Sequence, residues 1–179
     1  MKYLRAKDEN TAEIRQLFTK TFGDSEGQDE GVLIGSLAED LMTKTSDKDR
    51  RVFIAVDSTQ IIGCIIFSKL RFDKRNINAF LLAPVAVHTD YQGKGTGQKL
   101  IHFGHTELKK DSVELVVTYG DIHFYSRVGY KPVTEDVIPA PMKLTYPEGW
   151  LAQSLTGKEI PPLKGRLFCV EEINKPEYW

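Results

Sequence analysis

One stretch of the chain, residues 78–110, limits the possible folds more than any other. It begins with the apolar run NAFLLAPVAVH and continues into DYQGKGTGQKLI, where glycines stand at positions 93, 95 and 97. An apolar run of this length predicts a strand buried on both faces of a sheet. The apolar residues after the glycines repeat at helical spacing and predict a helix over 97–110. We therefore expect a strand, a glycine-rich loop and a helix at the centre of an α/β domain.

Pro84 lies inside the apolar run. Proline has no backbone N–H to donate to a neighbouring strand, and it is rare in the middle of a sheet. In a central strand, Pro84 therefore predicts a bulge or a split in the sheet at that position.

Strands and helices are also predicted on both sides of this unit. Upstream, alternating apolar and polar residues predict a short strand at Lys2–Ala6. β-branched and aromatic residues then predict a hairpin of strands 51–57 and 61–72. Downstream, residues 112–119 form another apolar run, and a short helix over 122–128 is expected to stop at the next glycine. The order of elements predicts an α/β (α+β mixed) domain with a mixed sheet flanked by helices.

Two helices are expected before the hairpin. Asn10 and Glu13 have the spacing of a capping box, and the first helix is expected to end at Gly23. The polar stretch 24–31 is typical of a loop, and apolar spacing predicts the second helix over 32–42.

The composition excludes several classes of protein. The 179 residues, 41% hydrophobic and 27% charged, suit one globular domain with a core. A formal net charge of −1 and the absence of a Lys/Arg run argue against a partner that is nucleic acid or membrane. No apolar window of about 18 residues and no apolar leader is present, so we expect a cytoplasmic protein. Cys64 and Cys169 lie in apolar runs and are expected to pack as small hydrophobic side chains without a disulfide.

The glycine loop has the features of a phosphate site. Backbone N–H groups at the start of a helix have no partner within the helix, and the helix dipole adds positive potential there. Glycines leave those N–H groups accessible and permit positive φ angles. The spacing does not fit the G-x-x-x-x-G-K-[ST] loop, and Gln98 and Leu100 stand where a dinucleotide fingerprint requires its third glycine. A glycine-rich turn without a ligand stays open as the alternative.

In its context the loop closely resembles the acetyl-CoA-binding motif of the GNAT superfamily of N-acetyltransferases. That motif joins an apolar strand and a short turn to Gln/Arg-x-x-Gly-x-Gly/Ala at the start of a helix. Gln92, Gly95 and Gly97 occupy its positions in LLAPVAVHTDYQGKGTGQKLI.

A second segment, GDIHFYSRVGYKPV, is similar to the last core helix of the same family, with Tyr125, Gly129 and Tyr130 at the matching positions. The phrases LAPVAV and GD..FY.R.GY are most similar to the YhbS-type branch of the family.

The resemblance implies a GNAT-type fold, in which a mixed, mostly antiparallel sheet is splayed at a bulged central strand. Residues 1–145 would form the acetyl-CoA-binding N-acetyltransferase domain, and residues 146–179 a C-terminal extension packed on it. Acetyl-CoA is the implied cosubstrate, with its pyrophosphate on the N–H groups of the loop and its pantetheine arm along the strand. The implied cofactor-binding residues are Val85, Ala86, Val87, Gln92, Gly93, Lys94, Gly95, Thr96, Gly97 and Gln98.

The resemblance also gives Tyr125 a catalytic role. The family's tyrosine faces the sulfur of the thioester, and a phenol can donate a proton to a departing thiolate. Backbone N–H groups freed near Val85 are candidates for stabilising the oxyanion. The general base is unassigned: Glu30, Glu39 and Asp40 lie where the family builds its acceptor pocket, yet each is typical of a solvated helix charge.

Histidines add little to this picture. His123 neighbours the tyrosine and is a weaker acid–base candidate. His102 and His105 are three residues apart on the predicted helix, but no further Cys, His or carboxylate ligands stand at metal spacing. We expect no metal site.

The sequence departs from the family motif at three points. Thr96 replaces an aliphatic residue, and Thr89 stands where proline often precedes the loop. The asparagine that many members carry after the next strand is missing, and Asp121 is the nearest polar group. Neither threonine removes an N–H donor from the loop.

The function implied is transfer of an acetyl group from acetyl-CoA to a primary amine, directly within a ternary complex. A catalytically inactive acyl-CoA-binding sensor or partner module is the alternative, and an acyl group longer than acetyl is a third. The acceptor, a small-molecule amine or a protein amino group, is open, as is a possible homodimer. Trp150 and Trp179 are expected in the core or at an interface.

Overall fold

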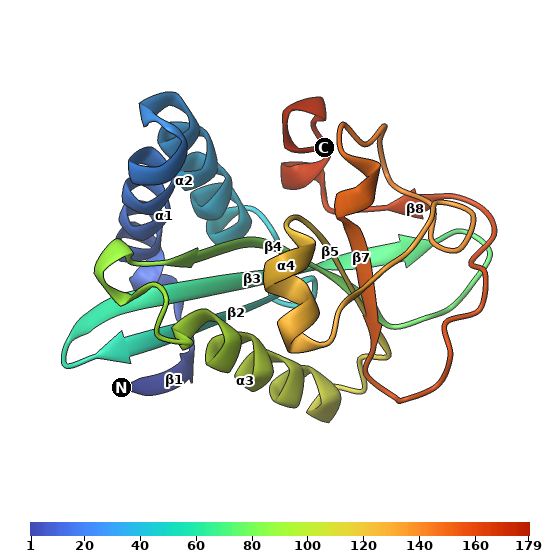
Figure 1. Cartoon of the computed structure of the whole chain (residues 1–179), viewed down its shortest axis with the longest axis horizontal. Helices are drawn as coiled ribbons and strands as arrows, with labels where there is room; N and C mark the ends of the chain where they lie inside the picture. The colour runs from blue at the N-terminus through green and yellow to red at the C-terminus, as the bar shows by residue number, and fades with distance from the viewer. The chain divides into compact units, whose positions relative to one another are not determined.

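The computed structural model describes all 179 residues (Figure 1). The chain divides into two compact units. Unit 1 contains Met1–Phe67 and Pro84–Gly104, and unit 2 contains Ser68–Ala83 and His105–Trp179. Three elements run through both units: β3 (Gln60–Phe72), β4 (Ala79–Val87) and α3 (Thr96–Lys110).

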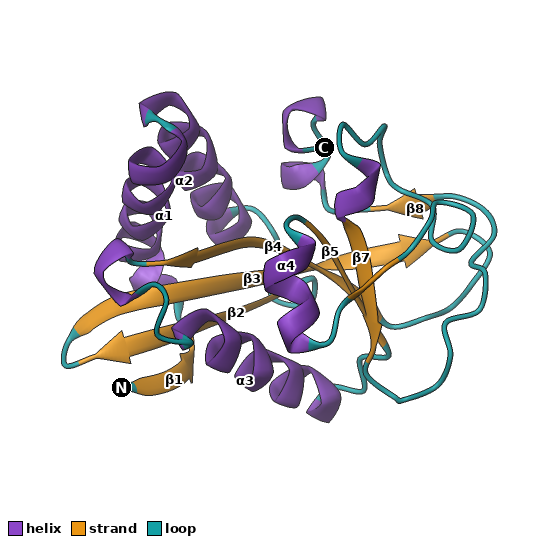
Figure 2. Ribbon diagram, in the orientation of Figure 1, coloured by secondary structure: helices purple, strands orange, loops and turns teal.

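The sheet has eight strands in the order β1-β2-β3-β4-β5-β7-β6, and β8 pairs with β3. Figure 2 shows these strands in orange and the helices in purple. The remaining strands are β1 (Lys2–Arg5), β2 (Arg50–Asp57), β5 (Leu115–Tyr119), β6 (Lys131–Pro132), β7 (Trp150–Ser154) and β8 (Leu167–Phe168). Pairing is antiparallel except between β4 and β5, among the pairs whose register is defined. The predicted mixed, mostly antiparallel sheet is confirmed.

The other helices are α1 (Thr11–Glu26), α2 (Gln28–Thr43) and α4 (Ile122–Tyr125). None of the helices combines the length and the apolar composition needed to cross a lipid bilayer. The helix predicted over 97–110 is α3, which begins one residue earlier than expected.

The predicted loop over 24–31 is wrong. α1 continues through Gly23 to Glu26, and a single residue, Gly27 with φ 103°, separates it from α2. The reason is packing between the two helices, which lie side by side in Figure 1. A Cβ on Gly31 would stand 2.4 Å from the Thr19 carbonyl oxygen and 2.8 Å from the Gly23 nitrogen. Glycines in this stretch therefore bring two helices together and do not mark a loop.

The predicted capping box at the start of α1 is also wrong. Asn10 is the residue before the helix, but its side chain accepts a hydrogen bond from the Lys7 backbone N–H at 2.9 Å and caps no α1 donor. Glu13 instead accepts from the Ile61 backbone N–H at 2.7 Å, at the start of β3. A tertiary contact has replaced the local one.

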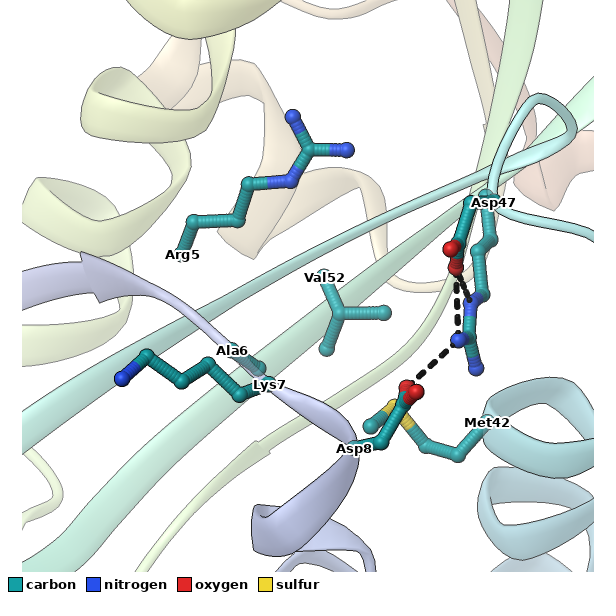
Figure 3. A pocket seen from close by; sticks show the side chains of 8 residues that line it. Arg5, Ala6, Lys7, Asp8, Met42, Asp47 and Val52 are labelled. Carbon is teal, nitrogen blue, oxygen red and sulfur yellow. Dashed lines mark hydrogen bonds and ion pairs between the residues drawn. The ribbon is translucent and has the colours of Figure 1, made fainter.

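Arg50, the first residue of β2, links the segment after β1 to the end of α2 and the turn that follows it. The Arg50 side chain is 10% exposed. Its guanidinium contacts the carboxylates of Asp8 and Asp47 at 2.7 Å each (Figure 3). It also donates to the Leu41 carbonyl oxygen at 3.4 Å, near the end of α2. A polar pocket of about 290 Å³ lies beside these groups and is lined by Arg5, Ala6, Lys7, Asp8, Met42, Asp47, Arg50 and Val52. Both carboxylates are bound to Arg50. We therefore interpret this group of charges as a structural link between elements and not as a ligand site.

In unit 2, β5 lies between two partners. It pairs parallel with β4 from Ala79–Leu115 to Leu82–Thr118, and antiparallel with β7. Pro84 follows the last of these β4 pairs, so its missing N–H costs this ladder no hydrogen bond.

The C-terminal residues take part in the same unit. β7 pairs with β5, and β8 pairs with β3. Trp150 and Trp179 are 1% and 5% exposed, and their indole N–H groups donate to the carbonyl oxygens of Ile138 and Ile173 at 2.9 Å each. Of the two places expected for these tryptophans, the core or an interface, the structure puts both in the core. The division at residue 145 stays a prediction.

Candidate functional site

The glycine loop in unit 1 is open to a ligand. Gly93 and Gly95 have φ angles of 72° and 76°, in the left-handed region that favours glycine. A Cβ placed on either residue meets no atom within 4 Å. The loop therefore has the positive φ angles predicted for it and free space above its backbone.

Helix α3 begins directly after this space. The Lys99 N–H donates to the Gly95 carbonyl oxygen at 3.0 Å, the first bond of the helical ladder. The N–H groups of Thr96, Gly97 and Gln98 precede it and have no acceptor within the helix. No acidic residue lies in the first turn. This helix end is thus suited to a phosphate group, because free N–H groups and the helix dipole both favour negative charge there.

Two side chains that were expected to bind the cofactor contact the backbone of β4 and of the turn before the loop. Gln92 Nε2 donates to the Val87 carbonyl oxygen at 2.9 Å. Lys94 Nζ donates to the Asp90 carbonyl oxygen at 2.8 Å and lies 5.6 Å from the centre of the Tyr91 ring. In this conformation both side chains stabilise the turn.

The strand segment before the loop alternates in exposure. Ala86 is 2% exposed, whereas Val85 and Val87 are partly exposed. The next residue, His88, donates its N–H to the Ile62 carbonyl oxygen on β3 at 2.8 Å. Loop and segment both belong to unit 1, so all ten residues expected to bind the cofactor lie in the same unit.

Tyr125 lies in unit 2, at the end of α4. Its ring meets Phe124 and Tyr130 edge-on, with ring centres 5.0 and 5.6 Å apart. Burial raises the pKa of Tyr125 to about 12, an effect that a hydrogen bond with Thr118 opposes and the nearby Asp121 carboxylate reinforces. The phenol is therefore protonated at neutral pH and is available as a proton donor.

Glycine makes room for this ring. A Cβ on Gly120 would stand 2.8 Å from Tyr125 Cε2. Asp121, which stands near the position of the missing family asparagine, caps α4 by accepting the His123 N–H at 2.9 Å. The residues around Tyr125 thus fix both the start of α4 and the place of the ring.

Behind Tyr125 lies a buried pair. His105 and Tyr130 are 4% and 1% exposed, and His105 Nε2 is 3.1 Å from the Tyr130 hydroxyl. Burial raises the pKa of Tyr130 well above its usual value. His102, three residues before His105, is exposed. The two histidines do not share an environment, and no group of three or more His, Cys, Asp and Glu side chains is placed to hold a metal ion.

The candidates for the general base have ordinary surface roles or none. Glu39 pairs with Arg15 at 2.8 Å, and Asp40 pairs with Lys44 at 2.9 Å. Glu30 is partly buried, and His123 is exposed. The base stays unassigned.

The cysteines play no part in these sites. Cys64 is fully buried and Cys169 partly buried, and both are free thiols. Burial raises the pKa of Cys169 to about 11, and the pKa of Cys64 is raised for the same reason.

Some residues that shape the two regions were missed by the sequence. Thr118 lies against Tyr125, and Asp24 and Asp57 bind the turn before the loop. No local pattern marks any of these three residues. Gly120, which also lies against Tyr125, belongs to the motif GD..FY.R.GY, but its contact with the ring could not be foreseen.

The chain resembles known proteins in sequence and in fold. Residues 48–132 match the family described as acetyltransferase (GNAT) domain. The chain is 29% identical to the uncharacterized N-acetyltransferase YjhQ of Escherichia coli K12 over 167 residues, which cover 90% of this chain and 88% of YjhQ.

Two crystal structures have the same fold. The GNAT family N-acetyltransferase YhbS from Escherichia coli, in complex with CoA, superposes with a TM-score of 0.83 at 21% identity, over 98% of this chain and 92% of that one. A GNAT family acetyltransferase from Brucella melitensis, in complex with acetyl-CoA, gives a TM-score of 0.75 at 22% identity, over 96% and 97% of the two chains. Over residues 48–132, which include the glycine loop, the chain matches a GNAT acetyltransferase domain, and the relative and the shared fold agree with this match.

Proposed function

We propose that the protein transfers an acetyl group from acetyl-CoA to a primary amine, directly between the two substrates bound together. The observation that carries this proposal is the loop at residues 93–98. It combines positive φ at Gly93 and Gly95, open space above both glycines, and the free N–H groups at the start of α3. The CoA and acetyl-CoA complexes of the two structural relatives support the same ligand.

The proposed binding roles follow the loop and the strand before it. The N–H groups of residues 93–98 bind the pyrophosphate, with Thr96 placing its hydroxyl in the first turn of α3. The backbone of Val85, Ala86 and Val87 binds the pantetheine arm as an added strand would. Gln92 and Lys94 hold the turn in shape through their bonds to the backbone. When bound, acetyl-CoA supplies the thioester from which the acyl group is transferred.

Tyr125 is the proposed proton donor to the departing thiolate. With a pKa of about 12, the phenol carries its proton at neutral pH. Gly120 and Thr118 position it. No cysteine intermediate is involved, because burial raises the pKa of both thiols and keeps them from acting as thiolates.

The acceptor is a small-molecule amine or a protein amino group. It must give up a proton before it attacks, and two of the three candidate carboxylates of α2, Glu39 and Asp40, are already held in ion pairs. We propose that water takes this proton or that the amine binds in its neutral form.

The test separates the pyrophosphate from the rest of CoA. Calorimetry with CoA and with pantetheine, which lacks the pyrophosphate, is expected to show binding of CoA and much weaker binding of pantetheine. Thiol release from acetyl-CoA over a broad panel of amines then identifies the acceptor. A wild-type protein that does not bind CoA would contradict the proposal.

The second candidate function, an acyl-CoA-binding sensor without turnover, is judged by the same two measurements. Binding of CoA without thiol release for any amine would favour the sensor. Release with at least one amine favours the enzyme.

A further inference from the structure

The turn that leads into the loop is tied to helix α1. Thr89 Oγ1 donates a hydrogen bond to Asp24 Oδ2 at 2.8 Å, across 65 positions of the chain. The same carboxylate oxygen accepts from Lys20 Nζ at 3.0 Å, one helical turn earlier. The hydrogen bond from Lys20 lowers the pKa of Asp24 most, and the hydrogen bond from Thr89 lowers it further. Asp24 is thus ionised and engaged at neutral pH.

A second carboxylate holds the other end of the same turn. Tyr91 donates its hydroxyl to Asp57 Oδ2 at 3.1 Å, and Asp57 is the last residue of β2. The bond to Asp57 raises the pKa of Tyr91. The turn over Thr89–Tyr91 is therefore fixed at both ends, just before the first glycine of the loop.

The charges make this arrangement informative. A carboxylate near a phosphate site weakens anion binding through repulsion, so its electrostatic effect opposes the proposed ligand. Its hydrogen bond has the opposite effect, because a turn held in place before binding loses less freedom when the ligand arrives. When the carboxylate is removed, the loss of repulsion would raise the affinity for CoA, whereas the loss of the hydrogen bond would lower it.

We infer that Asp24 is a positioning residue for CoA binding, acting through Thr89. This inference rests on the proposed function of the loop. The hydrogen bond from Thr89 to Asp24 fixes the turn at Thr89–Tyr91. The position of this turn then sets the direction of the N–H groups that follow Gly93. Because Asp24 belongs to α1, CoA binding and the position of α1 are coupled, and each is expected to stabilise the other.

The test compares the bond with the charge. Thr89→Val removes the hydroxyl at nearly constant shape, Thr89→Ser keeps it, and Asp24→Ala removes the acceptor. Glu26→Gln is the matched control, because it removes one negative charge from the same last turns of α1, at an exposed residue. CoA affinity is measured by calorimetry, KM and kcat by thiol release, and folding by thermal melting.

Thr89→Val and Asp24→Ala are each expected to weaken CoA binding about 2- to 10-fold, the usual range for one hydrogen bond. The double variant should lose no more than one single variant, since both remove the same bond. Thr89→Ser should bind as the wild type does, and Glu26→Gln should bind equally well or slightly more tightly. KM for acetyl-CoA should rise while kcat stays within about twofold.

Tighter CoA binding in Asp24→Ala would overturn the inference, because repulsion would then outweigh positioning. Unchanged affinity in Thr89→Val would overturn it as well, and in both cases wild-type binding of CoA would leave the proposed function intact. A wild-type chain that fails to bind CoA would overturn both.

Discussion

Glycines serve opposite purposes in the loop after β4 and in the segment around α4. A Cβ on Gly93 or Gly95 meets nothing within 4 Å, whereas on Gly120 it stands 2.8 Å from the Tyr125 ring and on Gly129 2.6 Å from the Gln153 amide nitrogen. In the loop the missing side chain leaves open space, which the proposed function assigns to CoA. Around α4 the space is already filled by the protein's own side chains. The difference predicts that changes in the loop act on CoA binding and changes around α4 act on turnover.

The largest effect on turnover is expected at Tyr125, the proposed proton donor on α4. Tyr125→Phe keeps the ring and its edge-on contacts but removes the hydroxyl group that would donate the proton. We expect kcat to fall about 100- to 10,000-fold, the usual contribution of a general acid, with CoA affinity unchanged. Thiol release and calorimetry measure the two quantities. If turnover survived at the wild-type rate, Tyr125 would be a packing residue and the two regions would not divide their roles as proposed.

Next in size is the loop itself. Gly95→Ala adds a methyl group where the backbone has φ 76° and lies beside the free N–H groups. We expect CoA affinity to fall about 10-fold or more, because a side chain at this φ costs about 1–2 kcal/mol and the N–H groups are displaced.

The chain offers a matched control for that change. Gly157 also has φ 76° and open space around its Cβ position, and it lies in unit 2. Gly157→Ala should cost similar stability in thermal melting and leave CoA affinity as it was. Equal losses of affinity in both variants would mean that backbone strain, and not the binding surface, explains the effect.

A smaller and mixed effect is expected at Gly120. Gly120→Ala pushes on the Tyr125 ring, and overpacking of this kind costs about 1–3 kcal/mol of stability. The displaced phenol should lower kcat about 10-fold, less than its removal. CoA affinity, followed by calorimetry, should stay near that of the wild type. A loss of affinity larger than the loss of kcat would contradict the contrast between the two regions.

The smallest effect concerns pH. The pKa of Tyr125 is raised from 10.0 to about 12, so folding favours its neutral form. The stabilisation that this shift gives is complete below pH 10 and is lost as the pH rises from 10 toward 12. Absorbance at the tyrosinate band, compared between wild type and Tyr125→Phe, should show this residue still neutral at pH 10. Titration near pH 10 would show that the ring is solvated.

The loop and its helix could be predicted from the sequence because their signals are local. Glycine spacing, the apolar run and the helical repeat after it all lie within residues 78–110, and the structure has β4, the loop and α3 there. The tyrosine on α4 was found through the resemblance to a family motif. Its role stays a prediction.

What could not be predicted depends on contacts between distant residues. Gly23 reads as a helix end, yet α1 passes through it because Gly31 packs against its backbone. Asn10 and Glu13 have the spacing of a cap, but they bond to Lys7 and Ile61. Nothing local to Asp24 indicates its bond to Thr89. Such contacts are decided by tertiary packing, which overrides local preference.

The position of β5 has a consequence for the synthesis of the chain. This strand is buried and apolar, and its partners arrive at different times: β4 precedes it, whereas β7 begins only at Trp150. A nascent chain that has reached Tyr119 but not Trp150 therefore exposes one open edge of a hydrophobic strand. Open edges of this kind recruit other chains. We expect this edge to stay open to other chains until β7 pairs with β5.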